Sequence, residues 1–384
     1  MALANSCAIV GTGKSQLGRT GLSALALVEQ AMRNAVEDAG LRMQDVDGII
    51  THDAGTYAHH QLVGERLGIN ARFSTSVDNG GASQVLAVSL AVMAIDAGLC
   101  STVLCACGHD NWGRTTSRAS GANASVLVPR TGDFRAEYGY YGAVAAHAFG
   151  TRRHMHVFGT TREQLGSVAV AFREHALRNQ DAVMKKQVTL DDYLAAPMIV
   201  DPFCLLDCSL VNDGAGAVVV TKLDRARHLR QPPIVIRGFG TFNNLTGWFQ
   251  DDHMIQTGAV ESSKEAYRMA GVTAKDISTA QIYDCFTGMV VIQLEDYGFC
   301  EKGEGGPFAE SGALRLDGAL PTNTSGGQLS EAHVEGMLQI VEGVQQLRHI
   351  YPPERQVPNA QIALVSGHGG NTVCHSTLIL GCES

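Results

Sequence analysis

The 384-residue chain has no run of lysine and arginine, no apolar stretch long enough to cross a bilayer, and no basic segment ahead of its first apolar residues. Its 29 basic and 38 acidic residues give a formal net charge of −9, so nucleic acids and anionic membrane surfaces are not expected as partners. A membrane span is not expected either, because one needs about 18 uncharged apolar residues. The opening MALANSCAIVG enters an apolar run directly. No signal peptide is therefore predicted, and we expect a cytoplasmic protein.

None of the ten cysteines forms the CxxC pair that commonly holds zinc. One residue separates Cys105 from Cys107 and three separate Cys204 from Cys208, and each pair lies in an apolar stretch. Small buried thiols, reduced in the cytoplasm, are the favoured interpretation. No metal site is predicted.

What the chain does contain is abundant glycine, at 43 positions, and strand-like stretches that alternate with helix-like ones. This alternation predicts an α/β architecture. Residues 112–200 differ, being richer in Arg, His and Tyr and weak in strand signals, and we interpret them as an inserted cap. The predicted strands are 8–11, 46–52, 101–109 and 210–223, and the predicted helices are 22–40, 83–98 and 161–179.

The pattern starts again after Pro232-Pro233. GGASQVLAVSLAVMAIDAG (80–98) leads to STVLCACGHD, and GGQLSEAHVEGMLQIVEGV (326–344) leads to AQIALVSGHGG. Each unit reads as a Gly-Gly turn, a long helix and an apolar strand that ends in Gly-His. We therefore predict two duplicated halves, residues 1–225 and 231–384, with the N-termini of both Gly-Gly helices near the molecular centre. Such N-termini stabilise anions.

Two histidine-containing segments are candidates for chemistry. In LSEAHVEG (329–336), His333 is predicted in the first turns of the second Gly-Gly helix, where the dipole favours a neutral imidazole that can donate to an oxyanion. In SGHGGNT (366–372), His368 could donate to a ligand that the Gly369 and Gly370 backbone approaches. The plainer alternatives are a structural His and a tight left-handed turn with an exposed His.

QIYDCFTG (281–288) is the third candidate. On a strand end, Tyr283 and Cys285 share one face and Asp284 points to the other. A phenol and a thiol side by side could hold a water molecule and move a proton. A buried strand end without a chemical role is the alternative.

Longer segments around these residues resemble the thiolase superfamily. They are YDCFTGMVVIQLEDYGFCEKGEGGPF (283–308), LPTNTSGGQLSEAHVEGM (320–337), QQLR (345–348) and LLDCSLVNDGAGAVVV (205–220). The resemblance is closest to the sterol-carrier-protein-type thiolases and the lipid-transfer-protein thiolase-like proteins. It implies a five-layered α/β/α/β/α fold of two duplicated halves, a homodimer, and an acyl-CoA thioester as substrate. Coenzyme A then enters as part of the substrate, with no bound cofactor.

The resemblance also implies site residues. The family's H-D-C-F motif supplies an oxyanion-hole His and an acid/base Cys, and these positions are Tyr283 and Cys285 here. The His of its G-H-P motif falls on His333. The acylated cysteine falls on Gly81, with the hydroxyl of Ser83 nearby but no evident base for it. Since a ping-pong thiolase needs a covalent acyl-enzyme, ordinary thiolysis is not expected.

A retro-aldol cleavage needs no covalent intermediate, so we predict an acyl-CoA carbon–carbon lyase that acts on a β-hydroxyacyl-CoA. Tyr283 would accept or relay the β-hydroxyl proton, His333 would donate to the thioester oxygen, and Cys285 would protonate the enolate carbon or orient a water molecule. His368, Gly369 and Gly370 would line the oxyanion side, and Gly81 would leave space where a nucleophile otherwise stands.

Two other functions stay open: a thiolase or acyltransferase with another nucleophile such as Cys285, and a non-catalytic subunit that binds acyl-CoA or lipid. The lipid-transfer-type aldolases, which shorten steroid side chains, are similar in carrying Tyr in the Y-D motif, but often have a second Tyr at the position of His333. The resemblance to them implies a small zinc-ribbon and OB-fold subunit and a heterotetramer. The acyl group, whether steroid, aromatic or aliphatic, stays open.

Overall fold

The computed structural model describes residues 3–52, 56–116, 138, 140, 142–244, 252–370 and 373–383. None of the helices in these ranges has the length and apolar character needed to traverse a bilayer. The strands are β1 (Cys7–Lys14), β2 (Gly48–His52), β3 (Phe73–Ser76), β4 (Thr102–Asp110), β5 (Met198–Val200), β6 (Phe203–Cys204), β7 (Asp213–Lys222), β8 (Ile234–Asn243), β9 (Thr279–Gln281), β10 (Ile362–Gly369) and β11 (Cys374–Cys382). The α-helices are α1 (Ala24–Asp38), α2 (His59–Leu67), α3 (Ser83–Asp96), α4 (Asn111–Thr116), α6 (Gly142–Phe158), α7 (Arg162–Arg178), α8 (Leu190–Leu194), α9 (Leu223–Ala226), α10 (Ala259–Ala270), α11 (Thr287–Asp296), α12 (Gly305–Glu310), α13 (Gly327–Ser330) and α14 (Met337–Leu347).

Nine strands form one mixed sheet in the order β3-β2-β4-β7-β1-β8-β11-β10-β9. Its two halves have the same topology. In the first half β2 and β4 are parallel, and β4, β7 and β1 are antiparallel. In the second half β9 and β10 are parallel, and β10, β11 and β8 are antiparallel. The register skips Val10 in β1 and Arg237 in β8, at equivalent points near the start of each strand. The predicted duplication is confirmed.

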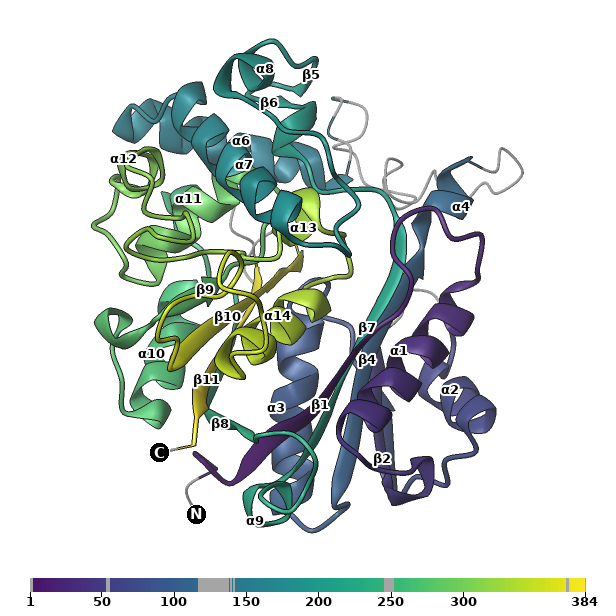
Figure 1. Ribbon diagram of the computed structural model, residues 1–384. Helices are drawn as coiled ribbons and strands as arrows, with labels where there is room; N and C mark the ends of the chain where they lie inside the picture. Colours follow the sequence, from purple (N-terminus) through teal and green to yellow (C-terminus); the bar gives the residue numbers. More distant parts are fainter. Residues whose placement is uncertain are drawn as a thin grey trace.

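The halves are joined edge to edge at two register pairs, Ala8 with Val235 and Ile9 with Ile234. Away from this seam they diverge, and α3 and α14 lie between them as a shared central layer (Figure 1). Helices α1 and α2 cover the outer face of the first half, and α10 and α11 cover that of the second (Figure 1). This arrangement is the predicted five-layered α/β/α/β/α fold.

The central layer explains the apolar runs in the sequence. Along β4, Val103, Cys105 and Cys107 pack toward α3, whereas Leu104 and Ala106 pack toward α1. A strand buried on both faces reads as a continuous apolar run because neither face can be polar. Helix α3 is apolar around most of its circumference for the same reason, since a sheet lies on each side of it.

The segment between β4 and β7 forms a cap at one end of the molecule, seen at the top of Figure 1. Its described α-helices and strands are α4, α6, α7, α8 and the β5–β6 hairpin. Residues 117–137, 139 and 141 of the predicted cap lie outside the described residues. Helix α7 begins where predicted because Thr161 and Gln164 form a reciprocal capping box.

One predicted element is wrong. The pattern of residues 326–344 indicated a single long helix, but the chain forms the one-turn α13, then an irregular connection, then α14. The break follows from the backbone of Glu335 and Gly336, at φ +48° and +87°, because left-handed residues end a right-handed helix. His333 therefore lies in the connection before α14 and not in the first turns of a helix that begins at Gly326.

Candidate active site

The candidate site lies between the end of β9 and the start of α11. Strand β9 stops at Gln281, so Tyr283 and Cys285 lie just beyond it and not on the strand itself. The Tyr283 backbone N–H donates to Ser366 Oγ at 3.2 Å, and its phenol Oη donates to Glu335 Oε2 at 3.1 Å. The Tyr283 side chain is almost fully buried. Tyr283 is thus fixed by one hydrogen bond at its backbone and another at its phenol hydroxyl.

The space beside Gly81 is occupied. A Cβ atom at Gly81 would lie closer than 3.0 Å to both the Tyr283 Oη and the His368 carbonyl oxygen, a separation that real Cβ atoms essentially never show. The structure thus differs from the expectation that Gly81 leaves room for an absent nucleophile, because Tyr283 fills that room. Gly81 is required so that the phenol can approach the backbone ahead of α3.

Glu335 is a functional candidate that the sequence analysis missed. Burial opposes ionisation of its carboxyl, but the imidazoles of His333, His109 and His52 and the Tyr283 hydrogen bond hold its pKa below the ordinary value of 4.5. His109 Nε2 lies 3.8 Å from Glu335 Oε1. Burial, and then the Glu335 charge, raise the pKa of Tyr283 well above 10.0. At neutral pH the pair is therefore a carboxylate that accepts a hydrogen bond from a neutral phenol.

His333 presents an unpaired nitrogen to the site. Asn212 brackets its peptide group: Asn212 Oδ1 accepts from the His333 N–H at 2.7 Å, and Asn212 Nδ2 donates to the His333 carbonyl at 3.3 Å. His333 Nε2 is buried and has no hydrogen-bond partner within the described part of the chain. A buried polar atom without a partner is costly, so this nitrogen is suited to bind a substrate oxygen.

Asn212 also lines a cleft of about 360 Å³. The cleft is mostly apolar, with Val183, Leu205, Val211 and Leu329 among its walls. Arg19 lies on one side of the cleft, and its guanidinium carbon is 3.8 Å from the centre of the Trp112 ring. Arg173 also lines the cleft. An apolar cleft with two cationic side chains in its walls is suited to an amphipathic, anionic ligand.

Cys285 lies in a cluster with His368 and His147, the latter from cap helix α6. One ligand atom of each, two imidazole nitrogens and the Cys285 Sγ, lie within 4.8 Å of one another, and His147 Nε2 is 3.0 Å from His368 Nε2. Burial lowers the pKa of His147 to about 4 and that of His368 well below 6.5. Burial, and then the charge of Asp284, raise the pKa of the Cys285 thiol well above 9.0. All three side chains are therefore neutral.

The hydrogen bonds in this cluster define the histidine tautomers. His147 Nδ1 lies 2.6 Å from the Ala143 carbonyl, so that nitrogen carries the proton. His147 Nε2 is then an acceptor, and His368 Nε2–H donates to it. His368 Nδ1 is left as a buried lone pair with no partner among the described residues. His368 itself is buried and not exposed as in the plainer alternative.

The remaining predicted residues frame the site. A Cβ at Gly369 would overlap the Asn79 carbonyl, so this glycine permits β10 to pack against the turn before α3, and Gly370 follows it at φ +59°. Ser83 is fully buried, and its Oγ accepts from the Asn79 N–H at 2.7 Å. That bond closes the turn. None of the described hydrogen bonds links Ser83 to Tyr283 or Cys285.

Asp284 anchors the segment from the opposite side, as its alternation with Tyr283 and Cys285 predicted. Its carboxylate accepts hydrogen bonds from the backbone N–H groups of Gln328 and Leu329, at 2.9 and 3.1 Å, and from Gln339 Nε2 at 2.9 Å. Burial raises its pKa from 3.8 to about 7, against the effect of these donors. The folded state thus holds this proton more tightly than the unfolded chain. The tighter binding of this proton adds to the free energy of unfolding at low pH. That addition declines as the pH rises from 3.8 to about 7.

Replacement of Asp284 by asparagine is expected to lower the free energy of unfolding by about 1–3 kcal/mol at a pH where the carboxylate is ionised. The new amide N–H₂ would face the Leu329 N–H and leave it unsatisfied. Guanidinium denaturation followed by circular dichroism measures the change. Asp224→Asn, at an exposed carboxylate paired with Arg227, is the control and should change stability by less than about 0.5 kcal/mol. Equal stabilities of the two variants would contradict the anchoring role.

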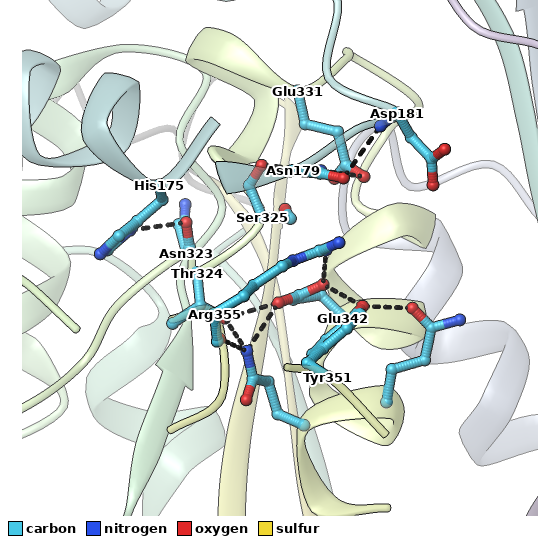
Figure 2. A network of polar contacts seen from close by, with 12 residues as sticks. His175, Asn179, Asp181, Asn323, Thr324, Ser325, Glu331, Glu342, Tyr351 and Arg355 are labelled. Carbon is cyan, nitrogen blue, oxygen red and sulfur yellow. Dashed lines mark hydrogen bonds and ion pairs between the residues drawn. The ribbon is translucent and has the colours of Figure 1, made fainter. Parts of the chain in front are cut away.

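A buried polar network supports the same segment from behind (Figure 2). Asn323 Oδ1 accepts from the Ile282 N–H at 2.7 Å, and its Nδ2 donates to the Ile282 carbonyl at 2.8 Å, directly before Tyr283. Next to Asn323, Glu342 accepts hydrogen bonds from Thr324, Tyr351 and Arg355. The two hydrogen bonds to Asn323 fix the peptide group of Ile282, so Tyr283 projects from a preorganised backbone.

Two family models match the chain: "Thiolase, N-terminal domain" over residues 7–224 and "Thiolase C-terminal domain-like" over residues 242–382. Among curated proteins, the chain is 34% identical over 394 residues to the 17-hydroxy-3-oxo-4-pregnene-20-carboxyl-CoA lyase of Mycobacterium tuberculosis. The alignment covers 99% of this chain and 100% of the lyase. It is 35% identical over 399 residues to the steroid side-chain-cleaving aldolase of Thermomonospora curvata, with 99% of each chain covered. It is 31% identical over 382 residues to an acetyl-CoA acetyltransferase of Methanothermobacter thermautotrophicus, with 96% of this chain and 98% of that protein covered.

Solved structures agree in fold. The Ltp2-ChsH2(DUF35) aldolase superposes with a TM-score of 0.89 at 33% identity and covers 100% of this chain and 99% of its own. Human mitochondrial 3-ketoacyl-CoA thiolase, solved with CoA, superposes with a TM-score of 0.75 at 15% identity and covers 100% of this chain and 99% of its own. At that identity the second match shows the fold alone.

Proposed function

The chain belongs to the thiolase family, and from that premise we propose that it is an acyl-CoA carbon–carbon lyase. It cleaves a β-hydroxyacyl-CoA by a retro-aldol reaction to an aldehyde or ketone and a shortened acyl-CoA. The observation that carries the proposal is the Tyr283–Glu335 pair, whose phenol fills the space beside Gly81 in which a side-chain nucleophile would have to begin. A retro-aldol cleavage needs a base at this place and no nucleophile, whereas a ping-pong thiolase needs the nucleophile. Two of the relatives are named a lyase and an aldolase.

The reaction begins at the β-hydroxyl. Tyr283 Oη accepts the hydroxyl proton as it passes its own proton to Glu335 Oε2, to which it is already hydrogen-bonded. The phenol does not need to ionise on its own, which its raised pKa would prevent, because the Glu335 carboxylate takes the charge. A positioned general base contributes about 10²–10⁴-fold to such a step.

Loss of that proton drives cleavage of the Cα–Cβ bond. The oxygen electrons form the new carbonyl of the aldehyde or ketone, and the bond electrons form the thioester enolate. His333 Nε2 is buried and has no partner among the described residues. In the tautomer that carries the proton on Nε2, it donates a hydrogen bond to the enolate oxygen. Asn212 holds the peptide group of His333 and so keeps the imidazole beside the cleft.

The enolate carbon then takes a proton. Cys285 is neutral because burial raises its pKa, and it is therefore equipped as the acid. The resulting thiolate regains a proton from Glu335 through Tyr283 and water, so the cycle ends with every group in its starting state. One ring nitrogen of His368 lies within 4.8 Å of the Cys285 Sγ.

We assign the acyl-CoA to the apolar cleft beside Asn212. Its apolar walls would hold the acyl chain, and Arg19 would attract the negative charge of coenzyme A. Coenzyme A then takes part as a piece of the substrate. A steroid-derived acyl group is the first class to test, because the curated lyase and aldolase relatives carry steroid names. This choice would place the protein in steroid degradation, a branch of lipid metabolism.

We further propose the assembly. The name of the Ltp2-ChsH2(DUF35) aldolase has two components, and one of its chains is 33% identical to this chain. A small zinc-ribbon and OB-fold subunit is the corresponding partner here, joined to a homodimer of this chain in a cytoplasmic heterotetramer. Co-expression with such a subunit, followed by light scattering, would yield a complex of twice two chains.

The test is an assay of β-hydroxyacyl-CoA and β-ketoacyl-CoA thioesters by liquid chromatography, with and without free coenzyme A and the small subunit. We expect an aldehyde or ketone from the β-hydroxy substrates without added coenzyme A. Tyr283→Phe should lose this activity, whereas Tyr267→Phe, which removes a remote phenol hydroxyl bonded to the Tyr297 carbonyl, should keep it. Cleavage confined to β-keto substrates and dependent on free coenzyme A would contradict the proposal and indicate an acyltransferase. Binding without turnover of either class would favour a non-catalytic subunit.

A further inference from the structure

We propose that His147, Cys285 and His368 form a binding site for a divalent transition-metal ion of the Zn²⁺ class. The three residues come from α6, from the segment after β9, and from β10, so distant parts of the chain bring them together. Their ligand atoms lie within 4.8 Å of one another. All three side chains are at least nine-tenths buried.

The distances are close to those that a tetrahedral ion requires. Zn–N and Zn–S bonds of about 2.0–2.1 and 2.3 Å put neighbouring ligand atoms about 3.4–3.7 Å apart. The His147 and His368 Nε2 atoms, at 3.0 Å, are already near that separation. The Cys285 Sγ, at most 4.8 Å from the imidazole nitrogens, has to move closer to them by up to about 1.4 Å.

The hydrogen bonds of the two imidazoles determine how each ring could bind an ion. His147 donates its Nδ1–H to the Ala143 carbonyl, the outer-shell hydrogen bond that fixes the tautomer and ring orientation of metal-binding histidines. His368 donates its one hydrogen bond from Nε2–H to His147, so ligation through Nε2 requires this proton to move to Nδ1, which has no partner among the described residues.

The donor set also selects the ion. A thiolate and two imidazoles suit Zn²⁺, Co²⁺ and similar ions, whereas Mg²⁺ and Ca²⁺ require oxygen ligands. Three protein ligands leave the fourth position of a tetrahedral ion open to water or to a substrate oxygen. Around the cluster, the rings of Phe286 and His375 lie 4.9 Å from His147 and 5.3 Å from His368, respectively. Such a shell keeps the dielectric low and strengthens the metal–ligand bonds.

The site has a consequence that rests on the proposed lyase function. Metal binding releases the Cys285 proton to solvent and occupies the sulfur, so the same thiol cannot serve as the acid that protonates the enolate. The ion and the cleavage reaction therefore compete. The rate of substrate turnover should therefore be highest for protein prepared without metal and should fall as added metal ions occupy the site.

The test is a titration of the chelator-treated, full-length protein with Co²⁺, read by its absorption spectrum. We expect one ion per chain, visible d–d bands of tetrahedral intensity, and a near-ultraviolet thiolate-to-cobalt band. Cys285→Ser should abolish the near-ultraviolet band. His147→Gln should weaken binding by at least about tenfold. Cys208→Ser, at a half-buried thiol in the neighbouring chain segment, is the matched control and should bind as the unmodified protein does.

Each outcome decides the matter. Absence of the thiolate band, or equal binding by Cys285→Ser and the control, overturns the site. Circular dichroism of each variant separates lost ligation from lost fold, and Zn²⁺ displacement of bound Co²⁺ tests the assigned ion class. The spectra need no substrate, so a failure here is distinct from a failure of the lyase assay.

Discussion

Replacing Glu335 with glutamine is expected to lower kcat/KM for retro-aldol cleavage by about 10²–10⁴-fold. The glutamine has nearly the same shape and can still accept a hydrogen bond from the Tyr283 phenol, but it cannot take the proton that the phenol relays. Steady-state kinetics on a β-hydroxyacyl-CoA would measure the loss. Glu354→Gln, which removes an exposed carboxylate, is the control and should leave the rate unchanged.

The pH profile adds an independent check. The imidazoles around Glu335 hold its pKa below 4.5, so the carboxylate base is present above that value and is lost as the pH falls through it. The unmodified enzyme should therefore show an acid limb below pH 4.5, provided that it stays folded there. Glu335→Gln should lack that limb. A limb that persists in the variant would assign the base to another group.

Gly81→Ala is expected to abolish cleavage and to lower the free energy of unfolding by about 1–3 kcal/mol or more. The added methyl would overlap the Tyr283 phenol and the His368 carbonyl, and the second of these is backbone that cannot rotate away. Thermal and guanidinium denaturation measure the stability, and the product assay measures cleavage. Gly113→Ala is a suitable control because a Cβ there meets nothing within 4 Å.

A double variant can separate the contribution of the Tyr283 phenol to this clash from that of the His368 carbonyl. Gly81→Ala with Tyr283→Ala should recover part of the stability, because the phenol is removed while the His368 carbonyl stays. For the same reason Gly81→Cys should not gain thiolase activity. A stable Gly81→Cys variant that forms an acyl-enzyme would show that the loop before α3 moves more than the packing allows.

Much of the fold could be predicted because each half repeats strong local signals. The helix expected at 83–98 and the strand expected at 101–109 match α3 and β4 to within two residues at each end, since most residues of both are buried and both read as long apolar runs. The break between α13 and α14 could not be predicted. A left-handed backbone at Glu335, a non-glycine residue, has no sequence signal, and the apolar pattern continues across it.

That break also explains why Glu335 was missed. On a continuous helix, residues two apart point in nearly opposite directions, so Glu335 would face away from His333. The irregular connection instead turns Glu335 toward Tyr283 and keeps the His333 imidazole close enough to affect the Glu335 carboxyl. His147 escaped notice for another reason: it lies in the cap, and nothing local indicates that α6 packs its imidazole against His368. Tyr283, Cys285 and His368 could be found because short, unusual motifs carry them.

The close approach of Tyr283 to Gly81 restricts the order in which such a site can arise by single substitutions. A cysteine at position 81 and a tyrosine at position 283 cannot occupy the same volume. An ancestor with the family's nucleophile would therefore have had to lose it first and pass through a form with neither group, in which a small cavity stood beside the α3 turn. The tyrosine could enter only afterwards. The return path is closed in the same way, so each chemistry, once established, excludes the first step toward the other.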